Sequence, residues 1–202
     1  ELNLIGAKGK LIAVEPSPKN IEIFKNNLDL NGISNVKVIE GAISDKEEKK
    51  DFHLADMGNL NTFHATGTGL QHLTGEVIKV NAYTIPQIMK DEGPLDLIRM
   101  DVEGHEVEVL NGMLSSVSSG ELRPSIIFET HLSRYGKEHD MESVLKLYFS
   151  EGYKTRYLAS SYEGGTAIIE ARGYKGSLPI ATDGVQRKIF ENISDNDSID
   201  FI

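Results

Sequence analysis

The chain has 202 residues, of which 39% are hydrophobic, and this is enough for one ordinary core, so we expect one domain over residues 1–202. Its 31 acidic residues exceed its 21 basic residues, and the formal net charge of -10 makes nucleic acid an unexpected partner. It has no cysteine, which excludes disulfides, thiolate metal sites and cysteine nucleophiles and fits the cytoplasm, where we expect the protein. No apolar run approaches the ~20 residues of a membrane-spanning helix, so we expect no membrane span.

The first predicted strand, residues 10–15, ends on an acid and leads into a helix. Ser17 is suited to cap that helix, Pro18 to its first position, and Gly32 to its end. A carboxylate at the tip of such a strand commonly accepts hydrogen bonds from both hydroxyls of a ribose. Glu15 is therefore our candidate ribose ligand.

The next segments are a strand and an inserted region. Residues 35–45 form a predicted strand that stops at a corner of small residues, and the region of about residues 46–82 is expected to be an insertion of strands around a polar loop. Asn59, Asn61 and Thr62 either line an acceptor pocket suited to a sugar or form a plain polar turn. The histidines of this region are expected at the surface or in hydrogen-bonded packing; they are His53, His64 and His72.

The most informative stretch follows the apolar strand of residues 95–100. Asp101 and Glu103 come where the strand stops, and the apolar spacing then becomes helical from Val107 onward. Open α/β sheets bind ligands beyond the carboxyl ends of their strands, so both acids are candidate site residues. Asp101 is alternatively a helix cap, and Glu103 alternatively accepts backbone donors in the sharp turn that Gly104 permits.

We expect no catalytic role for the two residues that follow this turn, His105 and Glu106. We expect His105 to face solvent, the usual state of such a residue. Glu106 suits the first turn of the helix, where the macrodipole favours an acid.

A third apolar strand, within residues 124–131, also ends in polar groups. Glu129 and His131 are two residues apart and are expected on one face of the strand, near the same rim as Asp101. These three residues are alternatively ligands of an oxygen and nitrogen metal site, although any strand offers this spacing, and we predict no metal.

The last third of the sequence predicts a helix and an antiparallel pair of strands. Asp140 is placed to cap a helix that Gly152 ends, and residues 153–159 and 166–171 are expected to form a closing hairpin through residues 163–165. The polar tail of about residues 192–202 is expected to fray. Strands alternating with helices predict an α/β fold: a mostly parallel sheet with helices on both faces and an antiparallel edge strand.

Taken together, these motifs resemble the FkbM family of S-adenosylmethionine-dependent methyltransferases. The resemblance rests on Val14-Glu15-Pro16, on Asp101-Val102-Glu103-Gly104 with its preceding strand, and on Pro124 to Glu129, and it extends from about Gly9 to about Ala171. It implies a Rossmann-like methyltransferase sheet, S-adenosylmethionine as the methyl donor, and O-methylation of a sugar, glycan or polyketide-like acceptor.

The resemblance also implies roles for individual residues. Glu15, with Pro16 beside it, would bind the ribose, and the corner formed by Gly41, Ala42 and Ile43 would be the adenine wall. Asp101 and Glu103 would face the methionine end and the acceptor. An alcohol is a poor nucleophile while protonated, so we expect a general base: Asp101 first, with Glu129 and His131 next.

One departure from the family pattern leaves other functions open. The family's first strand and glycine-rich turn are not seen, and Glu1 to Gly6 resembles the end of the helix after that turn, so we expect the missing segment upstream. An acid that ends a strand also suits the ribose of NAD, which makes an NAD-dependent oxidoreductase one alternative. A catalytically inactive methyltransferase-like scaffold is another, and a homo-oligomer is possible for each.

Overall fold

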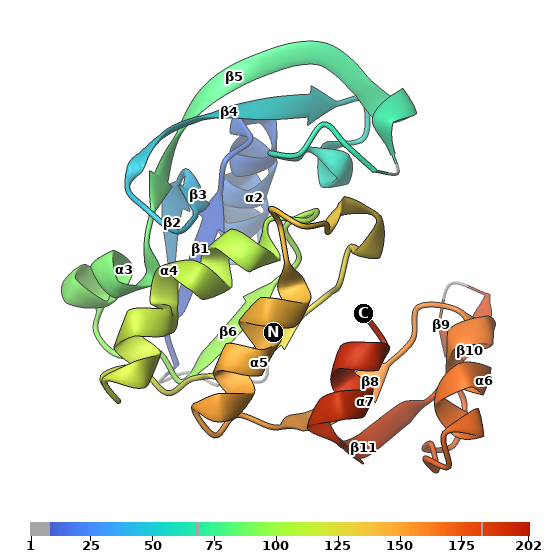
Figure 1. Cartoon of the computed structure of the whole chain (residues 1–202). Coiled ribbons are helices and arrows are strands. Elements are labelled where there is room, and N and C mark those ends of the chain that lie inside the picture. The colour runs from blue at the N-terminus through green and yellow to red at the C-terminus, as the bar shows by residue number, and fades with distance from the viewer. Residues whose placement is uncertain (1–8, 68, 183) are drawn as a thin grey trace. The chain divides into compact units, whose positions relative to one another are not determined.

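The computed structural model describes residues 9–67, 69–182 and 184–202 (Figure 1). The chain forms two compact units, residues 1–141 and residues 142–202, and each is described by itself. The predicted helix end at Glu1 to Gly6 lies outside the described residues. The single domain expected over the whole chain stays a prediction.

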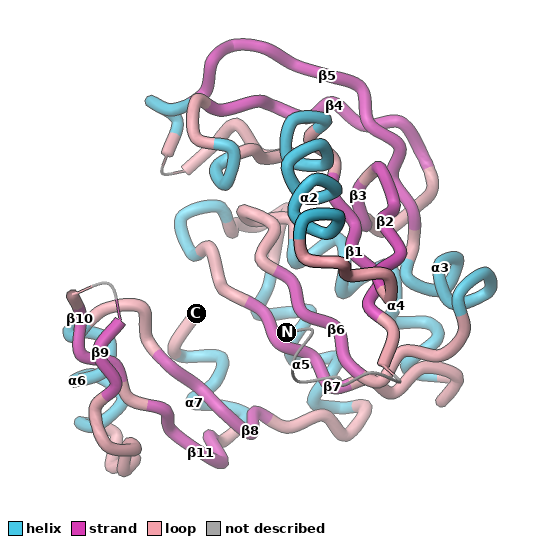
Figure 2. The backbone as a smooth tube through the Cα atoms, turned by 180° about the vertical axis from the view of Figure 1, so that it is seen from behind, coloured by secondary structure: helices cyan, strands magenta, loops and turns pink. Residues whose placement is uncertain are grey.

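The first described elements of the first unit are a strand, a helix and a parallel strand, as the sequence predicts. Strand β1 (Leu11–Glu15) is followed by helix α2 (Pro18–Leu30) and by β2 (Val36–Glu40). The side chain of Ser17 caps α2 by accepting a hydrogen bond from the Asn20 amide, with Pro18 in the first turn, as expected. Strands β1 and β2 pair in parallel, so that Glu15 lies opposite Glu40, and Figure 2 shows α2 beside both strands.

The inserted region forms a separate three-stranded sheet with β5 at its centre. Strand β5 (Leu73–Tyr83) pairs in parallel with the short β3 (Ala42–Ile43) and antiparallel with β4 (Glu48–Ala55). Two short 3-10 helices, η1 (Gly58–Leu60) and η2 (Leu70–His72), lie in the connection between β4 and β5. Figure 1 shows β4 and β5 as a long curved pair, which confirms the predicted strands of the insertion and extends them.

The rest of the first unit supplies a second parallel pair. Helix α3 (Ile85–Glu92) follows Thr84, whose hydroxyl caps the helix by accepting from the Gln87 amide. Strand β6 (Leu97–Met100), helix α4 (Glu106–Ser118) and strand β7 (Ser125–Phe128) follow, and η3 (Leu132–Arg134) comes after β7. Strands β6 and β7 are parallel with Met100 opposite Phe128, so both carboxyl ends lie at one edge. Helix α4 has a buried face in the core, which includes Val107, Leu110, Met113 and Val117.

The second unit does not contain the predicted hairpin of residues 153–159 and 166–171. After helix α5 (Met141–Ser150), strand β8 (Thr155–Ala159) pairs antiparallel with β11 (Ile189–Ile193), whereas residues 166–171 lie in helix α6 (Glu163–Ala171). The prediction of a second strand there was wrong because Thr166 and Ile169, three residues apart, share one buried helical face. A shorter antiparallel pair consists of β9 (Ile180–Thr182) and β10 (Val185–Arg187). The core of this unit centres on Ile169, Phe190 and Ile193.

The polar tail was expected to fray, and this was also wrong. Residues 195–200 form helix α7 (Asp195–Asp200), with Ser194 as its cap. The Arg172 guanidinium lies 2.7 Å from an Asp197 carboxylate oxygen and 3.0 Å from one of Asp200, so the acids that make the segment polar also hold it.

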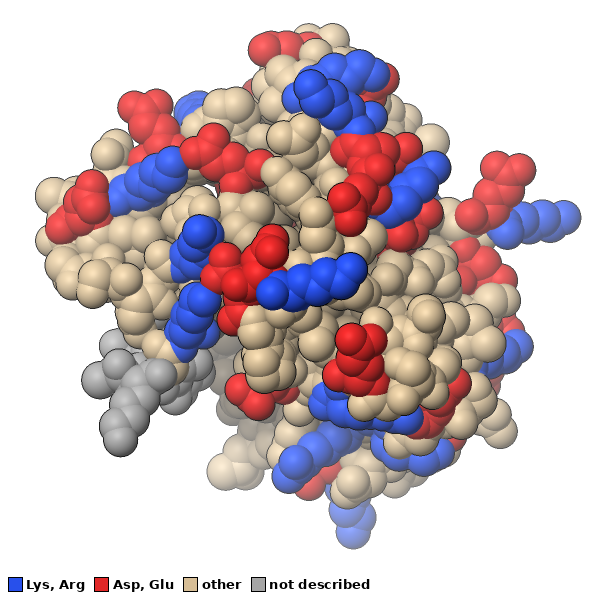
Figure 3. All heavy atoms as spheres, turned by 90° about the vertical axis from the view of Figure 1, so that its left-hand side faces the viewer, with Lys and Arg blue, Asp and Glu red and all other residues tan. Residues whose placement is uncertain are grey.

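The structure thus has a mixed α/β fold with mostly parallel pairs in its first unit. On the face drawn in Figure 3, the Lys and Arg side chains are interspersed with Asp and Glu. Among the described residues, none of the helices combines the length and the apolar character that crossing a bilayer requires.

Candidate functional site

A tight turn joins β6 to α4 and presents three polar residues at the carboxyl edge of the β6–β7 pair. Asp101 follows β6 directly, Glu103 has a φ of 51° and Gly104 a φ of 97°, and His105 caps α4. Both positive φ angles lie in the region that favours glycine, so Glu103 adopts a conformation of higher energy than an ordinary turn residue does. Because β7 is parallel to β6, the segment after β7 reaches the same edge.

The centre of this edge is the buried carboxylate of Glu106. Its side chain is completely buried and is approached by four donors: His131 Nδ1 at 2.9 Å, the Tyr135 hydroxyl at 3.0 Å, and the amides of Val102 at 3.2 Å and Gly104 at 3.4 Å. Burial by itself raises the pKa of this carboxyl, but the hydrogen bond and charge of His131, with the backbone donors, lower it overall. Glu106 is therefore an ionised anchor for the turn and for His131.

The other ring nitrogen of His131 faces the two acids of the turn. His131 Nε2 lies 3.8 Å from Asp101 Oδ1 and 3.7 Å from Glu103 Oε2. Burial lowers the pKa of His131, but the hydrogen bond to Glu106 and the charges of Glu106, Glu103 and Asp101 raise it overall. Burial raises the pKa of Glu103, and the positive charges of His131 and Arg134 offset only part of that rise. Asp101, Glu103 and His131 thus form one polar group whose ligand atoms lie within 4.8 Å of one another.

Arg134 ties this group to the inserted loop. Its guanidinium donates to the carbonyl oxygens of His64 at 2.6 Å and Thr66 at 2.9 Å, and it lies 3.4 Å from Glu103 Oε2. Its aliphatic stem packs over Gly104, where an added Cβ would overlap the Arg134 Cδ atom and lie 2.9 Å from its Cβ. The glycine is needed for this packing as well as for its φ angle.

Glu15 occupies the corresponding carboxyl end of β1. Its Oε1 atom accepts from the Ser17 amide at 2.8 Å and from Asn20 Nδ2 at 3.4 Å, and its backbone carbonyl accepts from the Gly41 amide at 3.0 Å. Burial raises the pKa of Glu15, and the two donors to Oε1 lower it by less. One carboxylate oxygen is thus fixed by the start of α2, next to the Gly41 corner.

Comparison with known proteins identifies the family to which this arrangement belongs. Residues 2–155 match the model of the methyltransferase FkbM domain. The chain belongs to the FkbM methyltransferase family. A curated protein of Jannaschia sp. (strain CCS1), described as a putative methyltransferase, is 29% identical over 139 residues, which cover 64% of this chain and 48% of that protein. The chain therefore spans about half the length of this relative, and no solved structure matches it.

Against this family background, the structure brings together three of the four predicted catalytic residues: Asp101, Glu103 and His131. Glu129 is exposed and does not belong to this ligand group. The expected two-residue alternation does not extend to His131, because β7 ends at Phe128 and His131 already caps η3. Glu103 takes the place that Glu129 had in the alternative set of metal ligands.

His105 and Glu106 also differ from expectation. His105 was expected in solvent, but its side chain is 1% exposed, and burial lowers its pKa to about 3, which keeps the ring neutral. The role of accepting the backbone donors of the turn, which the sequence suggested for Glu103, belongs to Glu106. Sequence reasoning missed Arg134, Tyr135 and His139, although residues 131–139 carry an unusual density of His, Arg, Tyr and charged groups directly after an apolar strand.

The polar residues of the insertion mostly have structural partners. Asn61 Oδ1 accepts from the Ala55 amide at 2.8 Å, and the buried Thr62 hydroxyl donates to the Glu103 carbonyl at 2.9 Å. Asn59 is exposed in η1. These contacts favour the plain polar turn over an acceptor pocket for Asn61 and Thr62.

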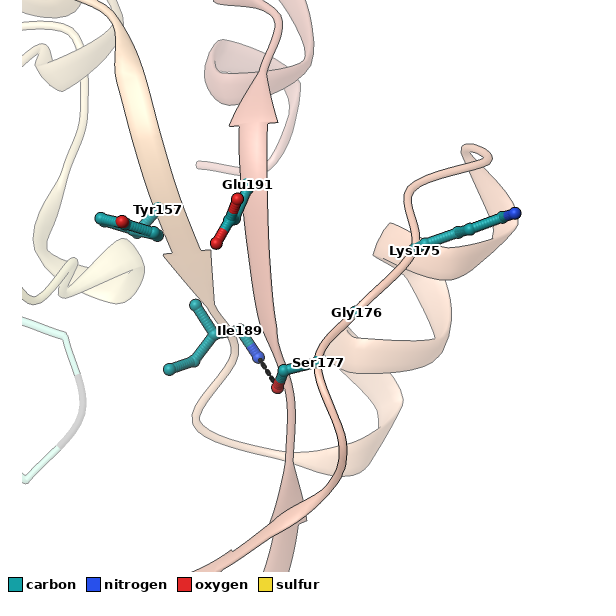
Figure 4. A pocket seen from close by; sticks show the side chains of 6 residues that line it. All are labelled: Tyr157, Lys175, Gly176, Ser177, Ile189 and Glu191. Carbon is teal, nitrogen blue, oxygen red and sulfur yellow. Dashed lines mark hydrogen bonds between the residues drawn. The ribbon is translucent and has the colours of Figure 1, made fainter.

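A hollow of about 620 Å³ lies in the second unit and contains none of the predicted site residues. Figure 4 shows it between Tyr157 on β8, Glu191 on β11 and the segment around Ser177, whose hydroxyl accepts from the Ile189 amide at 3.1 Å. Lys175 points away from the other labelled side chains (Figure 4).

Proposed function

We propose that this FkbM-family chain is an S-adenosylmethionine-dependent O-methyltransferase whose acceptor is an alcohol on a sugar, a glycan or a polyketide-like small molecule. The observation that carries the proposal is the Asp101, Glu103 and His131 group at the edge shared by β6 and β7, backed by the buried Glu106. We further propose that β1–β2 and β6–β7 belong to one Rossmann-like sheet, whose carboxyl edge presents Glu15 and Asp101 to one ligand. Nothing in the structure or the comparisons favours the NAD-dependent alternative.

The residues around Glu15 fit the cofactor by the chemistry of their atoms. S-adenosylmethionine supplies an electrophilic methyl group on a sulfonium. Because Oε1 of Glu15 is held by Ser17 and Asn20, the second carboxylate oxygen has a fixed position and suits a ribose hydroxyl donor. Pro16 and the corner of Gly41, Ala42 and Ile43 would line the nucleoside beside it.

We propose that His131 takes the proton of the acceptor hydroxyl, and the geometry around its ring supports this role. When Nδ1–H donates to Glu106, the tautomer of His131 is fixed and the lone pair on Nε2 faces the rim between Asp101 and Glu103. The two carboxylates would orient the acceptor hydroxyl, and Nε2 would take its proton while the oxygen takes the methyl group and the methyl–sulfur bond of the donor breaks. A positioned general base contributes roughly 10² to 10⁴ in rate. Glu106 and Tyr135 are positioning residues in this scheme.

His131→Asn tests the base by removing Nε2 while leaving an amide near Glu106. We expect methyl transfer to an alcohol panel, measured with methyl-labelled S-adenosylmethionine, to fall by roughly 10² or more. Since the pKa of His131 is raised, the wild-type rate should increase with pH through a midpoint above the ordinary histidine value of 6.5. His72→Gln is the matched control, because His72 lies outside the group and pairs with Asp56 at 3.1 Å. Full activity in the His131 variant, with loss of activity in Asp101→Asn, would assign the base to Asp101 instead.

Glu15→Gln tests the cofactor site without removing the oxygen that accepts from Ser17. Losing the negative charge weakens a charge-assisted hydrogen bond by about 1 kcal/mol or slightly more, so we expect S-adenosylhomocysteine to bind about tenfold more weakly in calorimetry. Glu40→Gln is the control, since Glu40 lies opposite Glu15 in the β1–β2 register and its side chain is 61% exposed. Binding of NAD in place of S-adenosylhomocysteine would refute the proposed cofactor.

A further inference from the structure

A second cluster of ligand atoms lies on the inner side of the same turn, separate from Asp101 and His131. It consists of His64 from the inserted loop, His105 at the cap of α4, and Glu108 in the first turn of α4. His64 Nε2 lies 3.0 Å from His105 Nδ1, His105 Nδ1 lies 3.3 Å from Glu108 Oε2, and Glu108 Oε2 lies 3.7 Å from His64 Nε2. From these distances we propose that His64, His105 and Glu108 bind a divalent transition metal, with Zn²⁺ as the best match.

The three distances, 3.0, 3.3 and 3.7 Å, bracket the edge length of a zinc coordination tetrahedron. Ligand atoms at the usual zinc distances of about 2.0 to 2.1 Å from a metal are about 3.3 to 3.4 Å apart in tetrahedral geometry. Two imidazoles and one carboxylate are also a ligand set that zinc uses when its fourth position stays open for water or substrate. His64 and Glu108 have side-chain exposures of 21% and 20%, which leaves the cluster a route to solvent.

The hydrogen atoms around His105 leave a lone pair that faces the other two ligands. The Ser44 hydroxyl donates its one hydrogen to Asp45 Oδ1 at 3.0 Å, so its oxygen accepts from His105 Nε2, also at 3.0 Å. A neutral His105 that donates from Nε2 has its lone pair on Nδ1, which points toward a carboxylate oxygen. In the metal-free protein this lone pair accepts the hydrogen of His64 Nε2 at 3.0 Å, and a cation that displaces that proton would be bound by both His105 Nδ1 and Glu108 Oε2.

Glu108 gives an independent indication of the same cation. Its Oε2 atom is buried and, within the part of the chain that the structure describes, accepts no hydrogen bond. Its Oε1 atom is 3.0 Å from His139 Nδ1, and His139 Nε2 in turn contacts the Gly104 carbonyl oxygen. One oxygen is thus oriented by a partner while the other faces the histidines, which is how carboxylates and histidines around a metal are arranged.

A metal at this position would join the inserted loop to the start of α4. The loop is already linked to the turn before α4 directly, where Thr62 binds the carbonyl of Glu103, and indirectly through Arg134, which binds the carbonyl of His64 and lies 3.4 Å from Glu103 Oε2. The metal would add a bond between the same two segments and so hold the turn that carries Asp101 and Glu103. This inference needs neither a methyl donor nor an acceptor, and its test does not measure methyl transfer.

The test is metal binding by the chelator-treated protein. We expect one equivalent of Zn²⁺ to bind in a competition titration with a chromogenic chelator, and Co²⁺ to give the intense visible absorption of a tetrahedral site. His64→Gln and Glu108→Gln each remove a ligand, and we expect them to weaken Zn²⁺ binding by more than the roughly 10- to 100-fold that loss of an outer-shell partner costs. Ser44→Ala should fall within that 10- to 100-fold range, and His72→Gln should bind Zn²⁺ like the wild type.

Two outcomes would overturn the proposal. Binding that survives in His64→Gln and Glu108→Gln but is lost in His131→Asn would place the metal at Asp101, Glu103 and His131. Absence of binding in the wild type would mean that His64 and His105 form a hydrogen-bonded pair only. Circular dichroism of each variant separates loss of a ligand from loss of the fold, and Zn²⁺ should raise the Tm of the wild type but not of a ligand variant.

Discussion

Glu106→Gln replaces a completely buried carboxylate by an amide of nearly the same shape. In the wild type, Oε1 accepts from His131 and from two backbone amides, and Oε2 accepts from the Tyr135 hydroxyl. The amide retains one oxygen, so the NH₂ group must face either Tyr135 or His131. The Tyr135 oxygen already accepts from the His131 amide at 3.1 Å, and its own hydrogen would then lack an acceptor.

The loss of unfolding free energy caused by Glu106→Gln follows from these contacts. A hydrogen bond to a charged group contributes about 1.5 to 3 kcal/mol and a neutral one about 0.5 to 1.5, so the His131 contact loses about 1 kcal/mol. An unsatisfied buried hydroxyl adds about 1 to 3 kcal/mol. We therefore expect Glu106→Gln to lower the free energy of unfolding by about 2 to 4 kcal/mol, a large share of the stability of a small protein.

The loss should depend on pH in a defined direction. The pKa of Glu106 is lowered on folding, so its stabilisation is present above the unfolded-state pKa and is lost as the pH falls through the folded-state pKa. The pKa of His131 is raised, so its stabilisation is complete below 6.5 and is lost as the pH rises through the folded-state pKa. The penalty of the substitution should thus be largest at mildly acidic pH and smaller at alkaline pH.

Urea denaturation followed by circular dichroism across this pH range measures the penalty. Asp51→Asn is the control, because Asp51 pairs with Lys79 at 2.7 Å on the surface and such pairs contribute about 0 to 1 kcal/mol. An NMR titration should show a lower pKa for His131 in Glu106→Gln. A penalty no larger than that of the control, with an unchanged His131 pKa, would refute the assignment of Glu106 as the charged anchor.

Three further substitutions test other contacts of the structure. Gly104→Ala should lower the free energy of unfolding by about 1 kcal/mol for its positive φ and by more for the clash with Arg134, as measured by urea denaturation. Tyr135→Phe deletes one donor to Glu106, so we expect a loss of about 1 to 2 kcal/mol in the same assay; an unchanged midpoint would contradict the bond. Arg172→Ala removes the ion pairs of Asp197 and Asp200 in α7 but leaves that of Asp195 with Lys154, and native-state hydrogen exchange should become faster in α7 while β8 and β11 keep their protection.

The parts of the fold that local patterns specify were predictable from the sequence. Ser17 with Pro18 marks the start of α2, and the apolar runs before Glu15 and Asp101 mark β1 and β6, because each signal is complete within a few neighbouring residues. The predicted hairpin failed where two local readings competed. Residues 166–171 contain enough apolar residues for a strand. They form a helix because Thr166 and Ile169 are buried on one side, and this burial depends on the rest of the unit.

The candidate site was predictable only in part, because its geometry depends on residues far apart in the chain. Asp101 and Glu103 were found because strand ends are where ligands bind. Glu106 appeared to be an ordinary acid of a first helical turn, since its two side-chain donors, His131 and Tyr135, come 25 and 29 residues later. His105 was expected in solvent because its partner Ser44 lies 61 residues away.

The residues whose surroundings the sequence did not predict lie around one turn, and this location supports the proposed function. Charged residues in the first turn of a helix usually lie in water, where they need no partner in the protein. Here the turn buries Glu106 and His105, places Glu103 at a positive φ and packs Arg134 over Gly104. Each of these arrangements costs free energy that ordinary turn residues would avoid. Such costs are expected to persist where the exact positions of side chains matter for function, and in the described first unit they surround the edge that presents Asp101 and His131.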